Sequence, residues 1–207
     1  MKKTIFAILM AMSLSAWAQS DEDKYEALIA SLSSQPEVTA SAPIAEPTPA
    51  FPNVSTQQAN LLVLAHQIAE KDGHKEPKLL QGLLMQETRA GADPNYKRPT
   101  NGCYGVLQLK IAATQDVLKA YPELLSKYNL NARDQNAIKK KLIHNDEFNL
   151  TVGSRYLLIL KTYGYSTMKQ LALAWNQGAG GAKRFNADTF PYVKGVVKHV
   201  KTLYAAK

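Results

Sequence analysis

The chain has 207 residues, a formal net charge of +8 and a single cysteine, Cys103. One cysteine excludes an internal disulfide framework, so a fold of this chain depends on its hydrophobic core. The charge is uneven: residues 19–58 hold six acids and one base, whereas residues 59–207 hold twenty-two bases and eleven acids. The basic part either binds a polyanion (nucleic acid, acidic lipid or a cell wall with peptide carboxylates) or is basic only for solubility.

Residues 1–18 predict a signal peptide. Lys2 and Lys3 precede an apolar run, and Ala-Trp-Ala at residues 16–18 forms an A-x-A cleavage site. The run is too short to span a bilayer, and no cysteine follows it as a lipid anchor would need. We expect cleavage after Ala18, export, and no transmembrane segment elsewhere, since no other run approaches about 18 apolar residues.

Residues 19–56 predict a leader and linker that is mostly disordered, first acidic and then rich in proline, alanine and serine. Five of the ten prolines lie in residues 33–56, a stretch with little that could form a core. Apolar residues within 25–32 recur at helical spacing, so a short docking helix and a disordered leader both remain open. The sequence assigns no role to residues 19–32.

The folded domain is expected over residues 57–207, after a helix N-cap at Ser55 or Thr56. Apolar residues recur at helical spacing, and Gly91 suits a left-handed helix stop. The loop 89–104 is rich in glycine, proline and asparagine. No strand-period pattern of useful length occurs, so the fold class is mainly α, in one domain. The expected helices cover residues 57–73, 77–91, 111–120, 132–141, 147–164, 166–176 and 191–206.

The second of these helices carries a carboxylate on its apolar stripe. Leu80, Leu83 and Leu84 follow the i, i+3, i+4 rule, and the next position on that face is Glu87. Burial raises the pKa of a carboxyl group, and the C-terminal end of a helix acts in the same direction. Such a group can protonate the leaving oxygen of a glycosidic bond. Alternatively the helix rolls, and Glu87 pairs with a surface lysine such as Lys110.

Four short motifs follow one another in the basic part. They read ETRAGADPNYKRPTNGCYGVLQL from Glu87, NLTVGSRYLLIL from Asn149, ALAWNQGAG from Ala172 and PYVKGV from Pro191. In this order they resemble the motifs of lytic transglycosylases of the soluble lytic murein type, which are related to goose-type lysozyme. The family patterns are E-S with a later G-A-x-G-L-M-Q-[IL], then N-[IL]-x-x-G-x-x-Y-L, A-L-A-A-Y-N-A-G-P-G and a Tyr-Val before the final helix. The resemblance covers roughly residues 60–200. The matched positions are Glu87, Gly102, Gly105, Gln108, Leu109, Asn149, Leu150, Gly153, Tyr156, Leu157, Asn176, Gly178, Gly180 and Tyr192.

The resemblance implies a lysozyme-like domain that cleaves the β-1,4 bond between N-acetylmuramic acid and N-acetylglucosamine in peptidoglycan. Glu87 would protonate the glycosidic oxygen, and the N-acetyl group of the sugar would help to stabilise the cationic centre. Glu87 would then take the proton of the C6 hydroxyl, which closes a 1,6-anhydro ring. One carboxylate suffices, and no cofactor is implied. We expect Asp93 to be a turn residue before Pro94, although it would be the second carboxylate of a hydrolase.

The resemblance also implies a substrate-binding set. Gln108 can donate to and accept from sugar amides, although bracing its own loop is the alternative. Asn176 and Tyr192 would line the cleft near Glu87, and Tyr192 could donate a hydrogen bond to its carboxylate. Gly178 and Gly180 would serve the turn. The expected substrate-binding residues are Gln108, Trp175, Asn176, Tyr192 and Thr88.

The sequence departs from the family at several positions. Thr88 replaces the family's serine and keeps a hydroxyl. Trp175 replaces a tyrosine, and its indole either stacks on a sugar or packs in the core. Cys103 occupies a small-residue position and is expected to be an inert buried thiol. The segment VLQLKIAAT lacks the family's methionine before Gln108 and its later proline.

Other classes of function find less support in the sequence. His66, His74, His144 and His199 are scattered, so we predict no metal site. A wall-binding accessory of a secretion or conjugation apparatus and a lysozyme-type hydrolase on the same scaffold remain alternatives. Nucleic-acid binding rests on charge alone and is not expected in an exported protein. We expect a periplasmic monomer that acts on peptidoglycan glycan strands.

Overall fold

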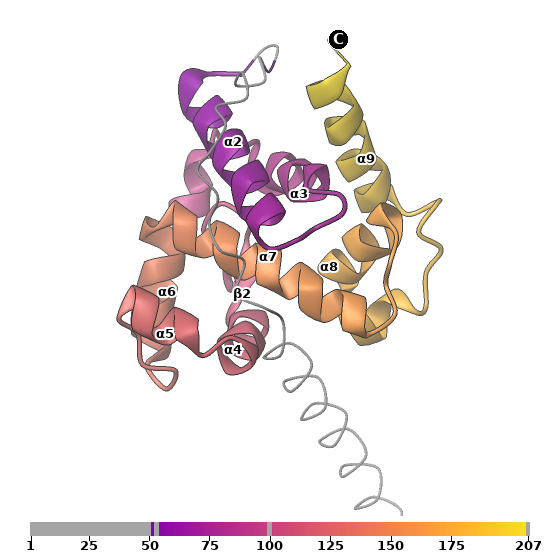
Figure 1. The fold of residues 1–207 in the computed structure, drawn as a ribbon. Helices are drawn as coiled ribbons and strands as arrows, with labels where there is room; N and C mark the ends of the chain where they lie inside the picture. Colours follow the sequence, from indigo (N-terminus) through magenta and orange to yellow (C-terminus); the bar gives the residue numbers. More distant parts are fainter. Residues whose placement is uncertain (1–50, 52–53, 99–100, 206–207) are drawn as a thin grey trace, which may run out of the picture. The chain divides into compact units, whose positions relative to one another are not determined.

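A computed structural model describes residues 51, 54–98 and 101–205 of the chain (Figure 1). These residues belong to one compact unit that spans residues 45–207. The predicted signal peptide, its cleavage site and the leader segment 19–50 lie outside the described residues.

The described part is mainly helical, as predicted from the sequence. Its elements in chain order are α2 (Thr56–Lys71), α3 (Lys78–Thr88), the 3-10 helix η1 (Pro94–Lys97), β1 (Cys103–Tyr104), β2 (Leu109–Lys110), α4 (Ile111–Ala120), α5 (Glu123–Tyr128), α6 (Gln135–His144), α7 (Asp146–Thr162), α8 (Met168–Ala182) and α9 (Pro191–Tyr204). The two short strands pair in an antiparallel hairpin, with Cys103 opposite Lys110 and Tyr104 opposite Leu109.

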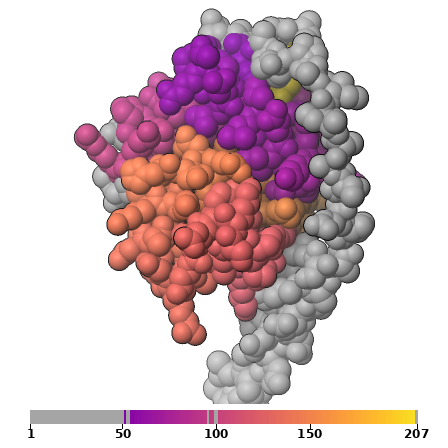
Figure 2. All heavy atoms as spheres, turned by 60° about the vertical axis from the view of Figure 1, so that its left-hand side comes forward, coloured from indigo at the N-terminus to yellow at the C-terminus, as the bar shows by residue number. Residues whose placement is uncertain are grey.

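Helix α7 runs through the middle of the unit, and the other helices pack around it (Figure 1). It contacts α2 on one side and α4 and α6 on the other, and α8 packs near its C-terminal half. Helices α3 and α9 pack against each other beside α2. From the side shown in Figure 2, the surface of α2 lies next to that of α7, so segments about 90 residues apart share one core.

The central position of α7 follows from its sequence. Asn145 caps its N-terminus by accepting a hydrogen bond from the backbone N–H of Phe148 at 2.7 Å. Leu150, Leu157 and Leu160, which the helical period places on one face, are buried. Phe148 is also fully buried, because α7 is covered on more than one side.

Each of the seven predicted helices has a counterpart in the described part of the chain, with local differences at their ends. Ser55 is the N-cap of α2, one of the two residues expected there, and Thr167 is the N-cap of α8, each within a capping box. Helix α5 was not predicted, because its six residues are too few to show a helical period. In α2 the buried positions include Leu62 and Ala69, whereas Leu64 and Ile68 are only half-buried.

The folded unit begins earlier than residue 57. Phe51 is only 8% exposed, and its ring meets that of Tyr204 edge-on with 6.4 Å between centroids. Phe51, a residue of the predicted linker, therefore packs against α9. No helix in the described part of the chain has the length and apolar character that crossing a bilayer requires.

Candidate active site

Helix α3 brings the apolar stripe and its carboxylate to the place that the sequence predicts. Leu80, Leu83 and Leu84 are fully buried against neighbouring helices. Glu87, one turn further on, is half-buried near the end of α3. The carboxylate thus lies at the edge of the core.

The carboxylate of Glu87 is held by two neutral donors from distant parts of the chain. The indole Nε1–H of Trp175 on α8 donates to Glu87 Oε1 at 3.1 Å. The hydroxyl of Tyr192 in the first turn of α9 donates to the same oxygen. The predicted contact of Tyr192 is therefore confirmed. The alternative partner Lys110 is exposed, and in the described part of the chain the hydrogen bonds to Glu87 come from Trp175 and Tyr192.

Burial raises the pKa of the Glu87 carboxyl group above its ordinary value. The hydrogen bonds from Tyr192 and Trp175 stabilise the anion and lower this pKa, but burial has the larger effect. The pKa of Tyr192 is also raised, first by burial and then by the nearby carboxylate, so the phenol remains a donor. Because both donors point at Oε1, a proton on Glu87 belongs on Oε2.

Local packing fixes the orientation of the two donors. Trp175 packs edge-on against Tyr156 of α7, with ring centroids 5.7 Å apart. A side chain at Gly153 would meet Leu107 Cδ1 at 2.3 Å and Trp175 Cη2 at 3.2 Å, so only glycine leaves room for both. Pro191 at the first position of α9 suits a helix start and places Tyr192 in the first turn.

Thr88 braces the loop after α3. It is 2% exposed, and its hydroxyl donates to the carbonyl of Val106 at 2.8 Å and accepts from the N–H of Gly91 at 3.1 Å. A buried hydroxyl with both functions used does not reach a sugar. We therefore correct its predicted role from substrate contact to support of the loop.

Helix α3 ends at Thr88, and its left-handed C-cap is Arg89, two residues before the predicted stop at Gly91. Arg89, Ala90 and Gly91 have φ of 52°, 52° and 78°, so three successive residues are left-handed. This conformation strains Arg89 and Ala90, since each carries a Cβ. Left-handed non-glycine residues cannot be read from composition, which is why Gly91 alone was predicted as the stop.

The β1–β2 hairpin is attached to α7 through one asparagine. Asn149 is fully buried, its Nδ2 donates to the carbonyls of Tyr104 (2.9 Å) and Leu142 (3.1 Å), and its Oδ1 accepts from Leu107 N–H (2.9 Å). Gly105 has φ +70°, and a Cβ there would meet Leu142 O at 2.0 Å. Two of the matched positions thus serve to hold the hairpin.

Two predicted substrate-binding residues make other contacts in the structure. Gln108 has φ +49°, and its Nε2 donates to the carbonyl of Gly105 at 2.9 Å, so it braces its own loop. Asn176 follows Trp175 on α8, is exposed, and accepts a hydrogen bond from the side chain of Gln177. Neither is among the partners of Glu87.

The remaining candidates behave as backbone or packing residues. Asp93 lies in the turn before Pro94, where its N–H donates to the carbonyl of Thr88 at 3.1 Å. Gly178 has φ 73° and ψ 160° and interrupts the helical path of α8, which agrees with its expected role in a turn. Cys103 is half-buried rather than fully buried, and burial raises the pKa of its thiol.

Within the described ranges, no group of three or more histidine, cysteine, aspartate or glutamate side chains is placed to hold a metal ion. Comparisons with protein-family models, with curated proteins and with solved structures found no match to this chain.

Proposed function

We propose that residues 57–207 form a lysozyme-like domain that acts as a peptidoglycan lytic transglycosylase, with Glu87 as general acid and then as base. The observation that carries this proposal is the environment of Glu87. Its carboxyl group has a raised pKa and is oriented by two neutral donors on one oxygen. The order of the four motifs supports the same family.

The chemistry follows from the two carboxyl oxygens. Glu87 Oε2 gives its proton to the bridging oxygen as the bond between that oxygen and the anomeric carbon of N-acetylmuramic acid breaks. The C6 hydroxyl of the same sugar then attacks the anomeric carbon, and its proton passes to the Glu87 carboxylate. The acid is regenerated, a 1,6-anhydro ring forms, and no water is consumed.

Tyr192 and Trp175 act as positioning residues in this scheme. Their hydrogen bonds to Oε1 fix the rotation of the carboxyl group and stabilise the anion that exists between the two proton transfers. We propose that Gln108 and Asn176 contact the sugar amides, since their amide groups are at least partly accessible.

The first alternative is a lysozyme-type hydrolase on the same scaffold. Water would then replace the C6 hydroxyl as nucleophile and would leave a reducing end. The second alternative is a wall-binding accessory of a secretion or conjugation apparatus that retains the fold without turnover. The raised pKa of Glu87 favours an enzyme, because desolvating a carboxylate costs stability and a binding protein gains nothing from it.

We further propose that the protein is exported by a signal peptide cleaved after Ala18 and acts as a monomer in the periplasm. Its partner is the glycan strand of peptidoglycan, and no nucleic acid or cofactor takes part. Release of the protein by osmotic shock supports this location, whereas recovery in the cytoplasm or growth medium contradicts it.

The function is tested by the loss of turbidity of a peptidoglycan suspension. We expect the wild-type chain to clear the suspension and Glu87→Gln to be slower by roughly 10²- to 10⁴-fold, the usual contribution of a general acid. Glu123→Gln is the matched control, because Glu123 is exposed at the first turn of α5. Equal clearing by wild type and Glu87→Gln removes Glu87 from the mechanism, and no clearing by either, with wall binding retained, favours the accessory.

A further inference from the structure

The outer face of α9 carries a row of lysines away from Glu87. Lys194, Lys198 and Lys201 are spaced i, i+4 and i+7, so they share one side of the helix. Tyr192 and Val196 lie on the opposite side, where Tyr192 donates to Glu87 and Val196 packs near Gly82 of α3. The lysine row is therefore separate from the candidate active site.

These lysines line a hollow of about 390 Å³ between α9, the start of α8 and the loop before α9. Its walls include Val193 and Val197 as well as the lysines.

The charge of this hollow is not balanced from within. Asp188 is the one acid of the lining, and it pairs with Lys169 at 2.5 Å. Among the described residues no ion pair joins Lys194, Lys198 or Lys201 to an acid. Like charges at i, i+4 destabilise a helix slightly, so this arrangement costs stability unless an anion binds.

The shape and lining indicate the class of anion. A concave site with valine walls suits a discrete ligand that carries both carboxylates and small apolar groups, whereas a bilayer presents a broad flat surface. Peptides with acidic residues and alanine side chains have this composition. Peptidoglycan bears such peptides on its N-acetylmuramic acid residues.

We propose that the hollow on the outer face of α9 binds the peptide stems of peptidoglycan through their carboxylates; this rests on the proposed function. The geometry permits one strand to reach both sites. A helix with side chains is about 10–12 Å across, so the path around half of it is roughly 16–19 Å, and an extended peptide of five residues spans up to about 18 Å. A stem that branches from a glycan strand near Glu87 can therefore reach the other side of α9.

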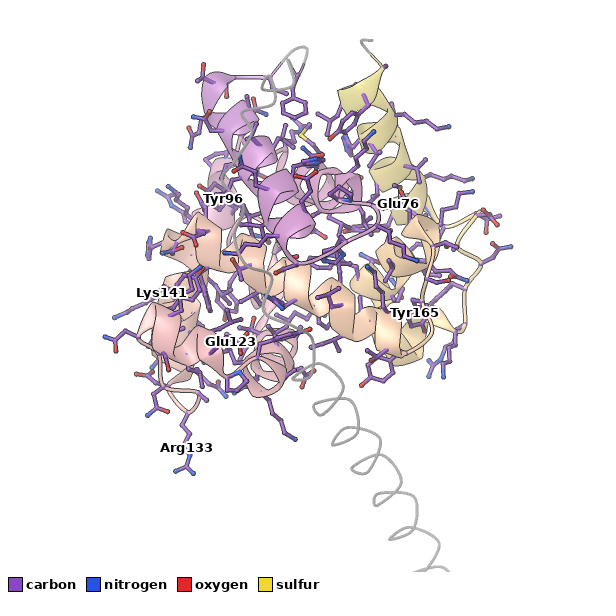
Figure 3. The ribbon with its side chains drawn as sticks, in the orientation of Figure 1. Glu76, Tyr96, Glu123, Arg133, Lys141 and Tyr165 are labelled. Atoms are coloured by element: carbon purple, nitrogen blue, oxygen red, sulfur yellow. The ribbon has the colours of Figure 1, made fainter. Side chains whose placement is uncertain are left out.

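The test measures binding by the full mature chain in a Glu87→Gln background, so that no turnover occurs. The ligands are soluble glycan strands with their stems intact and the same strands after an amidase has removed the stems. Lys194→Glu with Lys198→Glu is compared with Arg133→Glu and Lys140→Glu, an equal change of charge at exposed positions. Figure 3 shows Arg133 projecting from the segment before α6, at the end of the unit away from α9.

We expect the Lys194/Lys198 variant to bind stem-bearing strands about tenfold more weakly, as for the loss of a few exposed ion pairs. It should bind stem-free strands like its parent, and the Arg133/Lys140 variant should bind both as the parent does. Circular dichroism melting verifies that each variant is folded. Because binding is measured without catalysis, failure of the enzyme proposal appears separately as absence of cleavage products from the wild type.

Three results overturn the inference. Equal affinity of the parent for strands with and without stems removes the peptide as ligand. An equal loss in the Arg133/Lys140 variant reduces the effect to overall charge. Binding to phosphatidylglycerol vesicles that depends on Lys194 and Lys198, with no such dependence for stem-bearing strands, makes the partner a membrane.

Discussion

At the scale of a single residue, burial of Glu87 raises the pKa of its carboxyl group, which suits a general acid, but it also lowers the stability of the folded chain when the group is charged. Burial makes the charged form unfavourable, while Tyr192 and Trp175 recover part of that loss by donating to Oε1. The carboxyl group therefore binds its proton more tightly in the folded chain than in the unfolded chain. Its contribution to stability is present below the unfolded pKa, near 4.5, and is lost as the pH rises through the raised folded pKa.

We predict that Glu87→Gln stabilises the protein at pH 8, because the amide keeps an acceptor for both donors and carries no charge. Each kcal/mol of relief raises Tm by roughly 2–4 °C in a unit of this size. The gain should shrink at pH 4, where the native carboxyl group is protonated. Thermal melts of both proteins at the two pH values test this, and a Tm that falls at pH 8 contradicts it.

Tyr192→Phe should shift the pH dependence of the rate. The phenol lowers the pKa of Glu87, so its removal leaves that pKa higher, and the decline of activity with rising pH should move to higher pH. The maximal rate should fall by about tenfold or more, as for loss of a hydrogen bond to a charged group. Tyr163→Phe, at a tyrosine that is 55% exposed, is the control. An unmoved alkaline limb in Tyr192→Phe would show that Glu87 is not the titrating acid.

At the scale of elements, a buried polar network ties the end of α2 to α7. Ser154 Oγ donates to Asp72 Oδ2 at 2.6 Å, and Arg155 pairs with Asp72 at 2.8 Å. The Lys161 ammonium group lies 3.2 Å from His74 Nδ1 and can only donate a hydrogen bond, so Nδ1 is the acceptor. The proton of the neutral ring is then on Nε2, which lies 3.0 Å from the carbonyl oxygen of Ser154 and donates to it. The network therefore requires a neutral His74.

His74 should make stability depend on pH. Burial and then the charge of Lys161 lower its pKa from 6.5 to about 4. Its contribution is complete above pH 6.5 and is lost as the pH falls towards 4, because only the unfolded chain takes up the proton. Through this group, we expect the free energy of unfolding of the wild type to fall by about 3 kcal/mol over this pH range. Urea titrations from pH 7 to 4 measure how the free energy of unfolding depends on pH. His74→Gln should lack the part of this dependence that comes from His74, and His144→Gln, at an exposed histidine, should retain it. Parallel slopes for His74→Gln and wild type would contradict the assignment.

The helices could be predicted because amphipathic periods and caps are local signals. Ser55, Thr167 and Pro191 mark three helix starts in the sequence itself. The hairpin and α5 could not be predicted, since two and six residues show no period. The hairpin depends on Asn149, about 40 residues later, whose contacts are set by the tertiary fold.

At the scale of the whole molecule, both ends of the described chain meet. Phe51 packs on Tyr204, and Tyr204 in turn donates to the buried Gln81 of α3. We predict that Phe51→Ala lowers the free energy of unfolding by about 1.5–3 kcal/mol, the usual value for a buried phenylalanine side chain. Phe185→Ala, at a phenylalanine that is 47% exposed, should cost less. Equal urea midpoints for Phe51→Ala and wild type would place the start of the folded unit after Phe51.

The candidate site could be predicted in part from the sequence. The apolar stripe identified Glu87, and the motif order identified Tyr192 as its partner. The role of Trp175 was not predicted, because an indole 88 residues away gives no sign of which acceptor its N–H will find. The available signal was that tryptophan stands where the lytic transglycosylase motif has tyrosine. An indole N–H can only donate a hydrogen bond, so it suits a carboxylate as its acceptor.

In the proposed mechanism, Glu87 cleaves peptidoglycan without consuming water. Mass spectrometry of the soluble products from wild type and Glu87→Gln, each incubated with purified peptidoglycan in ¹⁸O-labelled water, tests it most directly. We expect unlabelled 1,6-anhydro-muropeptides from the wild type alone. Labelled reducing-end muropeptides would instead identify a hydrolase, and identical products from both proteins would contradict the role of Glu87.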